Sequence, residues 1–396
     1  MPGDMREGQG MQISRERILT THMGSLPRAE SLANLLISQD NGEAIDEAAL
    51  AARTEAAVTR VVARQRESGV DIANDGEQPR VGFQTYVSSR MSGFGGEGQR
   101  PEPTEIALFP EWAKMIKARR PPRARMYNAP AALAEVRYEN YAGISEECGL
   151  FRQALAGQKG DFVECFMTAA SPGIVATTMM NQYYDSHEDY LFALARGLGK
   201  EYRYIVDAGF LLQVDAPDLA MERACFFQDL SLAEFQASVA LHIAAINMAL
   251  DGIPAEKVRL HCCWGNRDGP HTEDVTLGDV LPLLLEAKVG GLCLPFANPR
   301  HAHEVELLRT VPLPPDMVLV TGAIESTSNY VEHPEVIAER IVRAAGALGD
   351  RERVIAGVDC GFGTFAGYSL VADDVVWAKL RALSVGATLA SQRLWS

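Results

Sequence analysis

The sequence predicts an α/β protein folded as a closed (β/α)8 barrel, or TIM barrel, with insertions. Short apolar runs typical of buried strands alternate with longer stretches of helical periodicity, and about eight such units follow one another. Strands that alternate with helices form parallel sheets, and eight units favour closure into a barrel over an open doubly wound sheet. Several apolar runs also end in polar residues, as in barrel enzymes, whose active sites lie at the carboxyl ends of the strands.

The strands are predicted from short apolar runs, and the helices from the longer stretches between them. The predicted strands cover residues 17–21, 70–74, 162–168, 210–214, 258–260, 291–294, 317–321 and 354–358. The predicted helices cover residues 43–68, 187–207, 232–251, 275–288, 334–348 and 373–389.

The domain organisation follows from what interrupts this alternation. Residues 1–15 are polar and contain glycine, and we expect them to form a flexible tail. We expect residues 16–396 to form a single barrel domain. A Pro-rich segment with a basic run, at about 100–130, predicts a long excursion from the barrel, and we interpret it as a candidate lid.

The composition is that of a globular chain that binds small molecules. Of the 396 residues, 47% are hydrophobic and 22% charged, which argues against a disordered or coiled-coil chain. Acidic residues outnumber basic ones by 52 to 37, and the resulting net charge of −15 would repel a nucleic-acid backbone. We therefore expect a small-molecule partner and no nucleic acid, while the sequence leaves an oligomer open.

Cysteine usage and the N-terminus indicate the compartment. The N-terminal residues lack the apolar core of a signal peptide, and no stretch of about 20 apolar residues follows. The seven cysteines are odd in number and irregularly spaced, which favours reduced thiols or metal ligands over a disulfide framework. We expect a cytoplasmic protein without membrane attachment.

Residues capable of chemistry cluster directly after four of the predicted strands. Because the carboxyl ends of barrel strands meet at one face, these side chains are expected to share a site. They are Asp75-Gly76-Glu77, Asp215, His261-Cys262-Cys263 and Asp359-Cys360.

A candidate metal centre is among these residues. His261 and Cys263 are two positions apart at a strand end, so their side chains point to the same face. With Cys360 they could offer one nitrogen and two thiolates to Zn²⁺. An isolated His-x-Cys pair is also common in ordinary cores, where small apolar cysteines pack, so spacing alone leaves both interpretations open. Trp264, beside these residues, is expected in the wall of the site.

Six segments together resemble the catalytic domain of the cobalamin-independent methionine synthases, in the same order as in that family. The resemblance runs from about Ile18 to the C-terminus and is greatest to the stand-alone, single-barrel members, which include the epoxyalkane:coenzyme M transferases. The segments are TTHMGSLPR (20–28), NDGEQPR (74–80), LLQVDAPDL (211–219), LHCCWGN (260–266), VEHPE (331–335) and GVDCGFGT (357–364).

The resemblance implies a role for each matching residue. Two carboxylates suit the binding of an ammonium group, and a histidine suits proton donation near neutral pH. By this resemblance, His261, Cys263 and Cys360 bind zinc, Gly24 and Ser25 hold the carboxylate of the thiol substrate, Glu77 and Asp215 hold its amino group, and His333 donates a proton.

The chain also departs from the family. Many members carry a glutamate as a fourth zinc ligand where this chain has Pro295, which cannot bind a metal. The centre would then have three protein ligands and close with water or substrate, or Cys293, Glu304 or Glu325 would stand in. The resemblance does not extend to the additional N-terminal barrel of full-length synthases, which helps to bind polyglutamyl folate.

The resemblance implies a zinc-dependent thiol alkyltransferase that moves a methyl group from a methyl-folate-type donor to a thiol such as homocysteine. An alternative is the addition of coenzyme M to an epoxide, for which Arg28 or Arg80 would bind the sulfonate. A third alternative, suggested by Pro295, is a protein that binds a thiol or a metal without catalysis.

Overall fold

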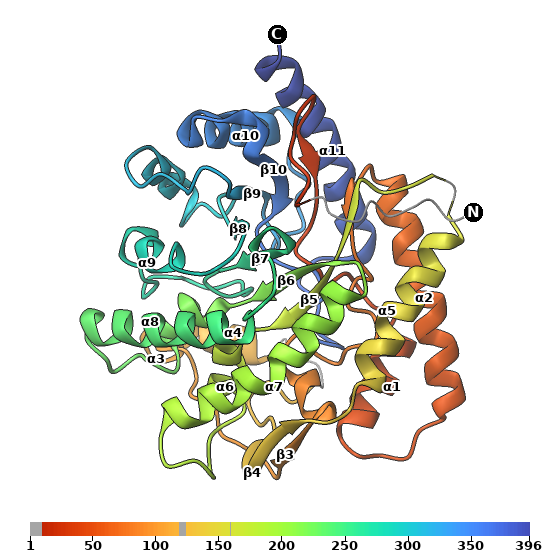
Figure 1. The fold of residues 1–396 in the computed structure, drawn as a ribbon, viewed down its shortest axis with the longest axis vertical. Coiled ribbons are helices and arrows are strands. Elements are labelled where there is room, and N and C mark those ends of the chain that lie inside the picture. Colours follow the sequence, from red (N-terminus) through yellow and green to blue (C-terminus); the bar gives the residue numbers. More distant parts are fainter. Residues whose placement is uncertain (1–9, 119–123, 159) are drawn as a thin grey trace.

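The computed structural model describes residues 10–118, 124–158 and 160–396, and its centre is an eight-stranded parallel barrel (Figure 1). The strand order is β1-β10-β9-β8-β7-β6-β5-β2, and a parallel bridge between Thr21 and Ile72 joins the two end strands. The predicted fold class is therefore confirmed. Helices surround the sheet, and the carboxyl ends of all eight strands meet at one face.

All eight predicted strands are confirmed, with small changes in their bounds. Their residues are almost all buried, which is why each strand appears in the sequence as an apolar run instead of an alternating pattern. The strands are β1 (Leu19–Thr20), β2 (Ile72–Ala73), β5 (Glu164–Ala170), β6 (Leu211–Asp215), β7 (Val258–His261), β8 (Gly291–Leu294), β9 (Val318–Ile324) and β10 (Val354–Val358).

The six predicted helices are also confirmed, and local signals explain where several of them begin and end. Ser231 caps α8 in a capping box with Glu234, and Gly349 ends α10 in a left-handed conformation with φ of 77°. The six are α2 (Glu47–Glu67), α7 (His187–Asp207), α8 (Leu232–Ala249), α9 (Leu277–Leu284), α10 (Pro334–Leu348) and α11 (Asp373–Leu394).

Sequence analysis did not predict α1 (Glu30–Asp40), α5 (Ala142–Ala156) or α6 (Pro172–Thr178). The short 3-10 helices are η1 (Thr85–Ser89), η2 (Pro217–Leu219), η3 (Met221–Ala224), η4 (Ala255–Lys257), η5 (Ala302–Arg309) and η6 (Arg351–Arg353).

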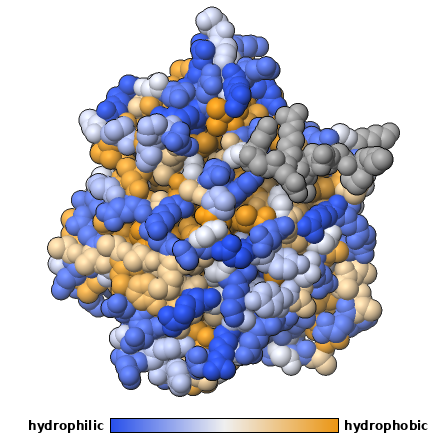
Figure 2. Space-filling model, viewed as in Figure 1, coloured by the Kyte–Doolittle hydropathy of each residue, from blue (hydrophilic) through white to orange (hydrophobic). Residues whose placement is uncertain are grey.

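Helix α8 is the one described helix whose length and composition would allow it to span a membrane. It has 18 residues, of which 39% are buried, and it packs between α7 and α9 in the outer ring of the barrel. Core helices of soluble proteins pass the same test, so this finding is weak evidence for a membrane span. On the face drawn in Figure 2, apolar residues are interspersed with hydrophilic ones.

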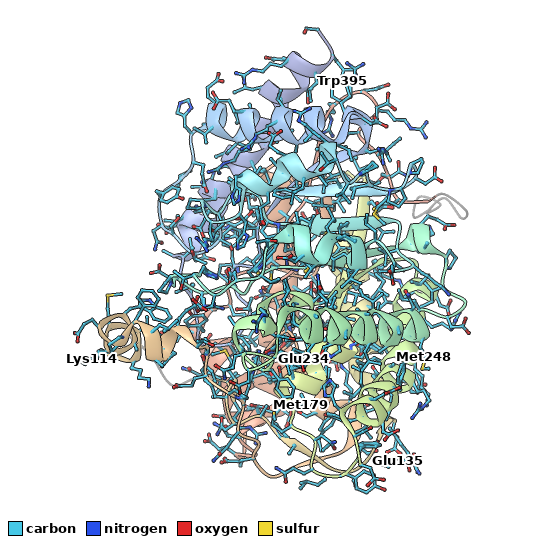
Figure 3. All side chains as sticks on the ribbon, turned by 90° about the vertical axis from the view of Figure 1, so that its left-hand side faces the viewer. Lys114, Glu135, Met179, Glu234, Met248 and Trp395 are labelled. Atoms are coloured by element: carbon cyan, nitrogen blue, oxygen red, sulfur yellow. The ribbon has the colours of Figure 1, made fainter. Side chains whose placement is uncertain are left out.

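The predicted excursion leaves the barrel between two strands of a separate antiparallel hairpin, β3 (Met91–Gly95) and β4 (Ala131–Tyr138). We call residues 96–118 the arm. The arm contains α3 (Glu105–Leu108) and α4 (Pro110–Ala118), and the helix that carries Lys114 projects from the body of the molecule in Figure 3. The basic run at 119–123 lies outside the described residues.

The expected flexible tail is only partly testable, because residues 1–9 lie outside the described residues. For residues 10–15 the expectation is wrong. Ser14 is fully buried, its hydroxyl donates to the carbonyl of Val354 at 2.6 Å, and the Met11 amide donates to Glu256 O at 3.0 Å. These bonds hold the segment against the amino end of the barrel, a long-range contact that polar composition does not reveal.

Candidate functional site

The carboxyl ends of the strands surround a cavity of about 790 Å³. The cavity is large enough for two small substrates, because ligand pockets typically measure roughly 300–1,000 Å³. Six of the eight predicted site residues line it, namely Ser25, Glu77, Asp215, His261, Cys263 and Cys360.

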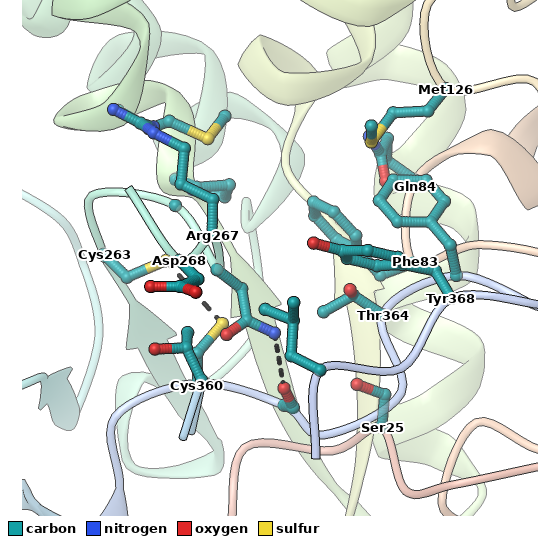
Figure 4. A pocket seen from close by; sticks show the side chains of 18 of the residues that line it. Ser25, Phe83, Gln84, Met126, Cys263, Arg267, Asp268, Cys360, Thr364 and Tyr368 are labelled. Atoms are coloured by element: carbon teal, nitrogen blue, oxygen red, sulfur yellow. Dashed lines mark hydrogen bonds between the residues drawn. The ribbon is translucent and has the colours of Figure 1, made fainter. Parts of the chain in front are cut away.

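A nitrogen and two sulfur atoms meet at one side of this cavity and form the candidate metal centre. One ligand atom from each of His261, Cys263 and Cys360 lies within 4.8 Å of the others, and all three residues are buried. The two Sγ atoms are 4.0 Å apart, and a dashed line marks their contact in Figure 4. His261 is the last residue of β7, and Cys360 lies just beyond β10, so the barrel brings together residues almost 100 positions apart. This set of donor atoms fits a tetrahedral Zn²⁺ site with an open position.

The imidazole of His261 is oriented by a carboxylate. Its Nδ1 lies 3.0 Å from Asp215 Oδ1, which also accepts from Gln213 Nε2 at 2.7 Å. Metal-binding histidines commonly bond a carboxylate through the ring nitrogen that does not bind the metal, which fixes the ring orientation. Nε2, which lies 3.3 Å from the carbonyl oxygen of Asp359, is therefore the nitrogen left for coordination.

The two thiols of the centre have different acidities. A hydrogen bond from Cys360 lowers the pKa of Cys263 well below its usual range, and the nearby His261 acts in the same direction. The same bond raises the pKa of Cys360. Burial opposes protonation of His261, but the adjacent Cys263 and Asp215 raise its pKa. The cluster thus favours a thiolate at Cys263 without any external base.

None of the proposed substitutes for a fourth protein ligand belongs to the His/Cys/Cys cluster found among the described residues. Glu304 bonds His301 and the amide of Leu277, and Glu325 accepts from Thr327. Cys293 is fully buried in β8. The three-ligand alternative is therefore the one that the geometry favours.

Glu77 is held in a strained backbone conformation at the cavity wall. Its φ of +53° is uncommon for a residue with a side chain, and such strain persists where surrounding bonds over-determine it. Its amide donates to Asp75 Oδ1 at 2.9 Å, and Arg28 donates to its carbonyl. Burial and the neighbouring Asp215 raise the pKa of Glu77 to about 8. Among the described residues, its Oε2 has no hydrogen-bond partner.

Gly24 and Ser25, the predicted carboxylate-binding pair, lie beside Glu77. Gly24 has a φ of +102°, and a Cβ there would approach Glu77 Oε1 and Thr168 Cγ2 to 2.6 Å, so the position requires glycine. Ser25 lines the cavity, whereas Gly24 is not one of its lining residues. The structure therefore gives Gly24 a steric role beside its predicted binding role.

His333 is placed apart from the other predicted site residues. It is exposed, does not line the cavity, and caps the N-terminus of α10 by accepting from the Glu335 amide at 3.2 Å. Its role as a proton donor stays a prediction.

Trp264 was expected in the wall of the site but is not one of the residues that line the cavity. Its ring stacks on that of His301, with the ring centres 3.9 Å apart.

The arm supplies another wall of the cavity, which sequence reasoning did not resolve into residues. Arg100 on the arm pairs with the fully buried Glu222, and Arg267 on the barrel pairs with the fully buried Glu105 of α3 at 2.6 Å. Trp112 Nε1 donates to the Asp268 carbonyl at 3.0 Å. Further apolar residues on this wall are Pro101, Pro103, Ile106 and Ile116. Only the Pro-rich composition of the segment pointed to it.

Comparisons with known proteins agree with this architecture. No protein-family model matches the chain. A methionine synthase of Thermococcus kodakarensis is 24% identical over 343 residues, 86% of each chain. A methionine synthase of Sulfolobus acidocaldarius is 26% identical over 265 residues, 66% of each chain.

Two solved structures share the fold over nearly their full lengths. A B12-independent methionine synthase from a Shewanella species, solved in complex with selenomethionine, has a TM-score of 0.72 at 20% identity and covers 96% of this chain and 99% of its own. A putative vitamin-B12-independent methionine synthase from Listeria monocytogenes has a TM-score of 0.65 at 18% identity and covers 98% and 100%. The chain is thus similar to methionine synthases in sequence and in fold. The resemblance inferred from the six motifs is thus confirmed.

Proposed function

We propose that this relative of the methionine synthases is a zinc-dependent methyltransferase that uses homocysteine as the acceptor and a methyl-folate-type compound as the donor. The observation that carries the proposal is the approach of one imidazole and two thiols to within 4.8 Å beside two buried carboxylates that line the same cavity. The names and folds of the relatives support it.

The carboxylate side of the cavity suits a thiol that also carries an ammonium group. Glu77 and Asp215 both line the cavity, and Glu77 Oε2 lacks a partner among the described residues. Burial without a donor disfavours the charged form of Glu77, in line with its raised pKa, and an ammonium group from the substrate would supply the missing donor and favour the carboxylate. Ser25 and the adjacent backbone would hold the carboxylate of the same substrate.

The reaction exchanges one bond at carbon for another. Zinc bound by His261, Cys263 and Cys360 would stabilise the substrate thiol as a thiolate, which is the nucleophilic form. The thiolate sulfur forms the new S–C bond with the methyl carbon, and the electron pair of the broken bond stays on the donor, which takes up a proton. The residues of the chain orient the imidazole through Asp215, hold the ammonium group, and enclose the reactants beneath the arm.

Neither of the two arginines considered for binding the sulfonate of coenzyme M lines the cavity among the described residues. A sulfonate would need a free cation, but Arg80 bonds Glu147 and Thr168, and Arg28 donates to the carbonyls of Gly363 and Glu77. The two arginines considered for this role are thus already engaged. This observation favours the amino-thiol over the sulfonate.

Activity assays on the zinc-loaded chain test the proposal. Homocysteine and coenzyme M are each offered with mono- and triglutamyl methyltetrahydrofolate or with an epoxide, and the thioether product is measured. We expect methionine from homocysteine and the folate donors. A thioether formed only from coenzyme M and the epoxide overturns the proposal. A chain that binds less than one zinc and shows no change at the metal on adding thiol supports the non-catalytic alternative.

A further inference from the structure

A chain of buried hydrogen bonds leads from helix α5 to Glu77. Glu147 of α5 accepts from Arg80 Nη2 at 2.8 Å, and Arg80 Nη1 donates to Thr168 Oγ1 of β5 at 3.0 Å. The Thr168 hydroxyl then donates to Glu77 Oε1 at 3.0 Å. Each of these residues is at most 5% exposed, so water does not compete for these bonds.

The arginine leaves the Thr168 proton available for the last bond. A guanidinium can only donate hydrogen bonds, and a hydroxyl has a single proton. Because Thr168 Oγ1 accepts from Arg80, its own proton is free to be given to Glu77 Oε1. Arg80 is in turn held by two further bonds, from Nη2 to Thr168 O at 2.9 Å and from Nε to Glu147.

Because of this bond, the two carboxyl oxygens of Glu77 have different surroundings. Oε1 is engaged as an acceptor from within the protein, and Oε2 has no partner among the described residues. Gly24 permits this arrangement, because a Cβ there would collide with both Glu77 Oε1 and Thr168. Glu77 lines the cavity, so its unpartnered oxygen is the one left for a substrate.

We propose that Thr168, polarised by Arg80, is a positioning residue that makes this site select thiols carrying an amino group. This inference rests on the proposed function, because it assumes that a thiol substrate enters the cavity. Thr168 does not line the cavity and acts only through Glu77. Without the hydroxyl of Thr168, Glu77 loses the bond that orients its carboxyl group. Both carboxyl oxygens then compete for the same donor.

The test compares two thiols that differ in one group, homocysteine and 4-mercaptobutanoate, which lacks the amine. Their affinities for the zinc-loaded protein are measured by calorimetry, and kcat and KM are measured with the methyl donor. For Thr168→Val, we expect KM for homocysteine to rise roughly 10–100-fold, as for the loss of a charge-assisted hydrogen bond, with a smaller change in kcat. The constants for 4-mercaptobutanoate should change less than about threefold.

Two further variants separate positioning from a general structural defect. Thr168→Ser keeps the hydroxyl and should restore most of the preference for homocysteine. Thr178→Val makes the same substitution at another buried threonine, whose hydroxyl has no partner among the described residues, and should leave both thiols unaffected.

The outcomes distinguish this inference from the proposed function. If Thr168→Val weakens both thiols equally, or keeps the parental preference, Thr168 is not a positioning residue and the proposed function stands. If the parent protein binds both thiols equally, the inference is overturned and the proposed function stands. If it binds neither thiol, both are overturned.

Discussion

The two walls of the cavity are built in different ways. One wall, here called the metal-binding wall after the candidate centre, comes from residues at or just beyond strand ends, such as His261 and Cys360, whose positions the barrel fixes. The arm wall follows strand β3 of a separate hairpin. Ion pairs such as Arg267–Glu105, which join segments 162 positions apart, hold it to the barrel. The candidate chemistry therefore depends on the barrel itself, whereas enclosure of the substrates depends on a few tertiary bonds.

The largest effects are expected on the metal-binding wall. Cys360→Ser and His261→Ala should each lose the metal and reduce activity by roughly 10³-fold or more, because a tetrahedral site cannot keep its affinity with one of three protein ligands removed. Metal content by mass spectrometry and methionine formation check this.

Cys262→Ala is the matched control for these variants. Cys262 is next to Cys263 but is fully buried in the apolar core and does not line the cavity. We expect the Cys262→Ala variant to keep its metal and to lose about 1 kcal/mol in its free energy of unfolding. Full metal content in both ligand variants would refute the assignment of the centre.

On the arm wall, breaking one buried ion pair should weaken the contact between the arm and the barrel without removing the metal. Arg267→Met leaves the fully buried Glu105 without its cation, and such a loss costs about 3–5 kcal/mol. We expect faster hydrogen exchange over residues 96–118, a higher KM for the methyl donor, and unchanged zinc content.

An exposed pair on the same arm provides the comparison. Lys114 and Glu111 are 73% and 85% exposed, so Lys114→Met should change stability by less than about 0.5 kcal/mol and leave exchange in the arm unchanged. If Arg267→Met behaves like Lys114→Met, the ion pair does not fasten the arm.

The same contrast explains how much the sequence could predict. The eight strands and the cluster of His261, Cys263 and Cys360 follow from apolar runs and from the rule that strand ends share one face. The bonds of Arg267 to Glu105 and of Arg80 to Thr168 have no local signature, because each joins distant segments that meet only in the folded chain. Residues 10–15 were misjudged for the same reason, since polar composition suggested a free end while Ser14 is buried by a strand more than 300 positions away.

The titration of Glu77, beside the metal-binding wall, should make the free energy of unfolding depend on pH. Because burial and Asp215 raise the pKa of Glu77 from 4.5 to about 8, the folded protein binds this proton more tightly than the unfolded chain. Stability from this group is therefore fully present below about pH 4.5 and is lost as the pH rises towards 8. Glu77→Gln cannot titrate, so its free energy of unfolding relative to the parent should increase over this window and level off above it.

Unfolding by urea at several pH values measures this difference. Titrating groups that do not interact with Glu77 are common to both proteins and cancel in the comparison. A difference that is constant from pH 5 to 9 would show that Glu77 does not titrate in this range.

The smallest effect is expected at His333, where the family motif and the geometry predict different results. The motif assigns it proton donation, but its exposed ring caps α10 and lies away from the cavity lining. From the geometry, His333→Ala should cost about 0.5–1 kcal/mol of stability through the lost cap and change kcat by less than about threefold. A 100-fold fall in kcat, with a change in its pH dependence between 6 and 8, would instead require the loop before α10 to carry this ring into the cavity during turnover. His333→Asn separates the two roles, because asparagine caps a helix well but cannot donate a proton as an acid near neutral pH.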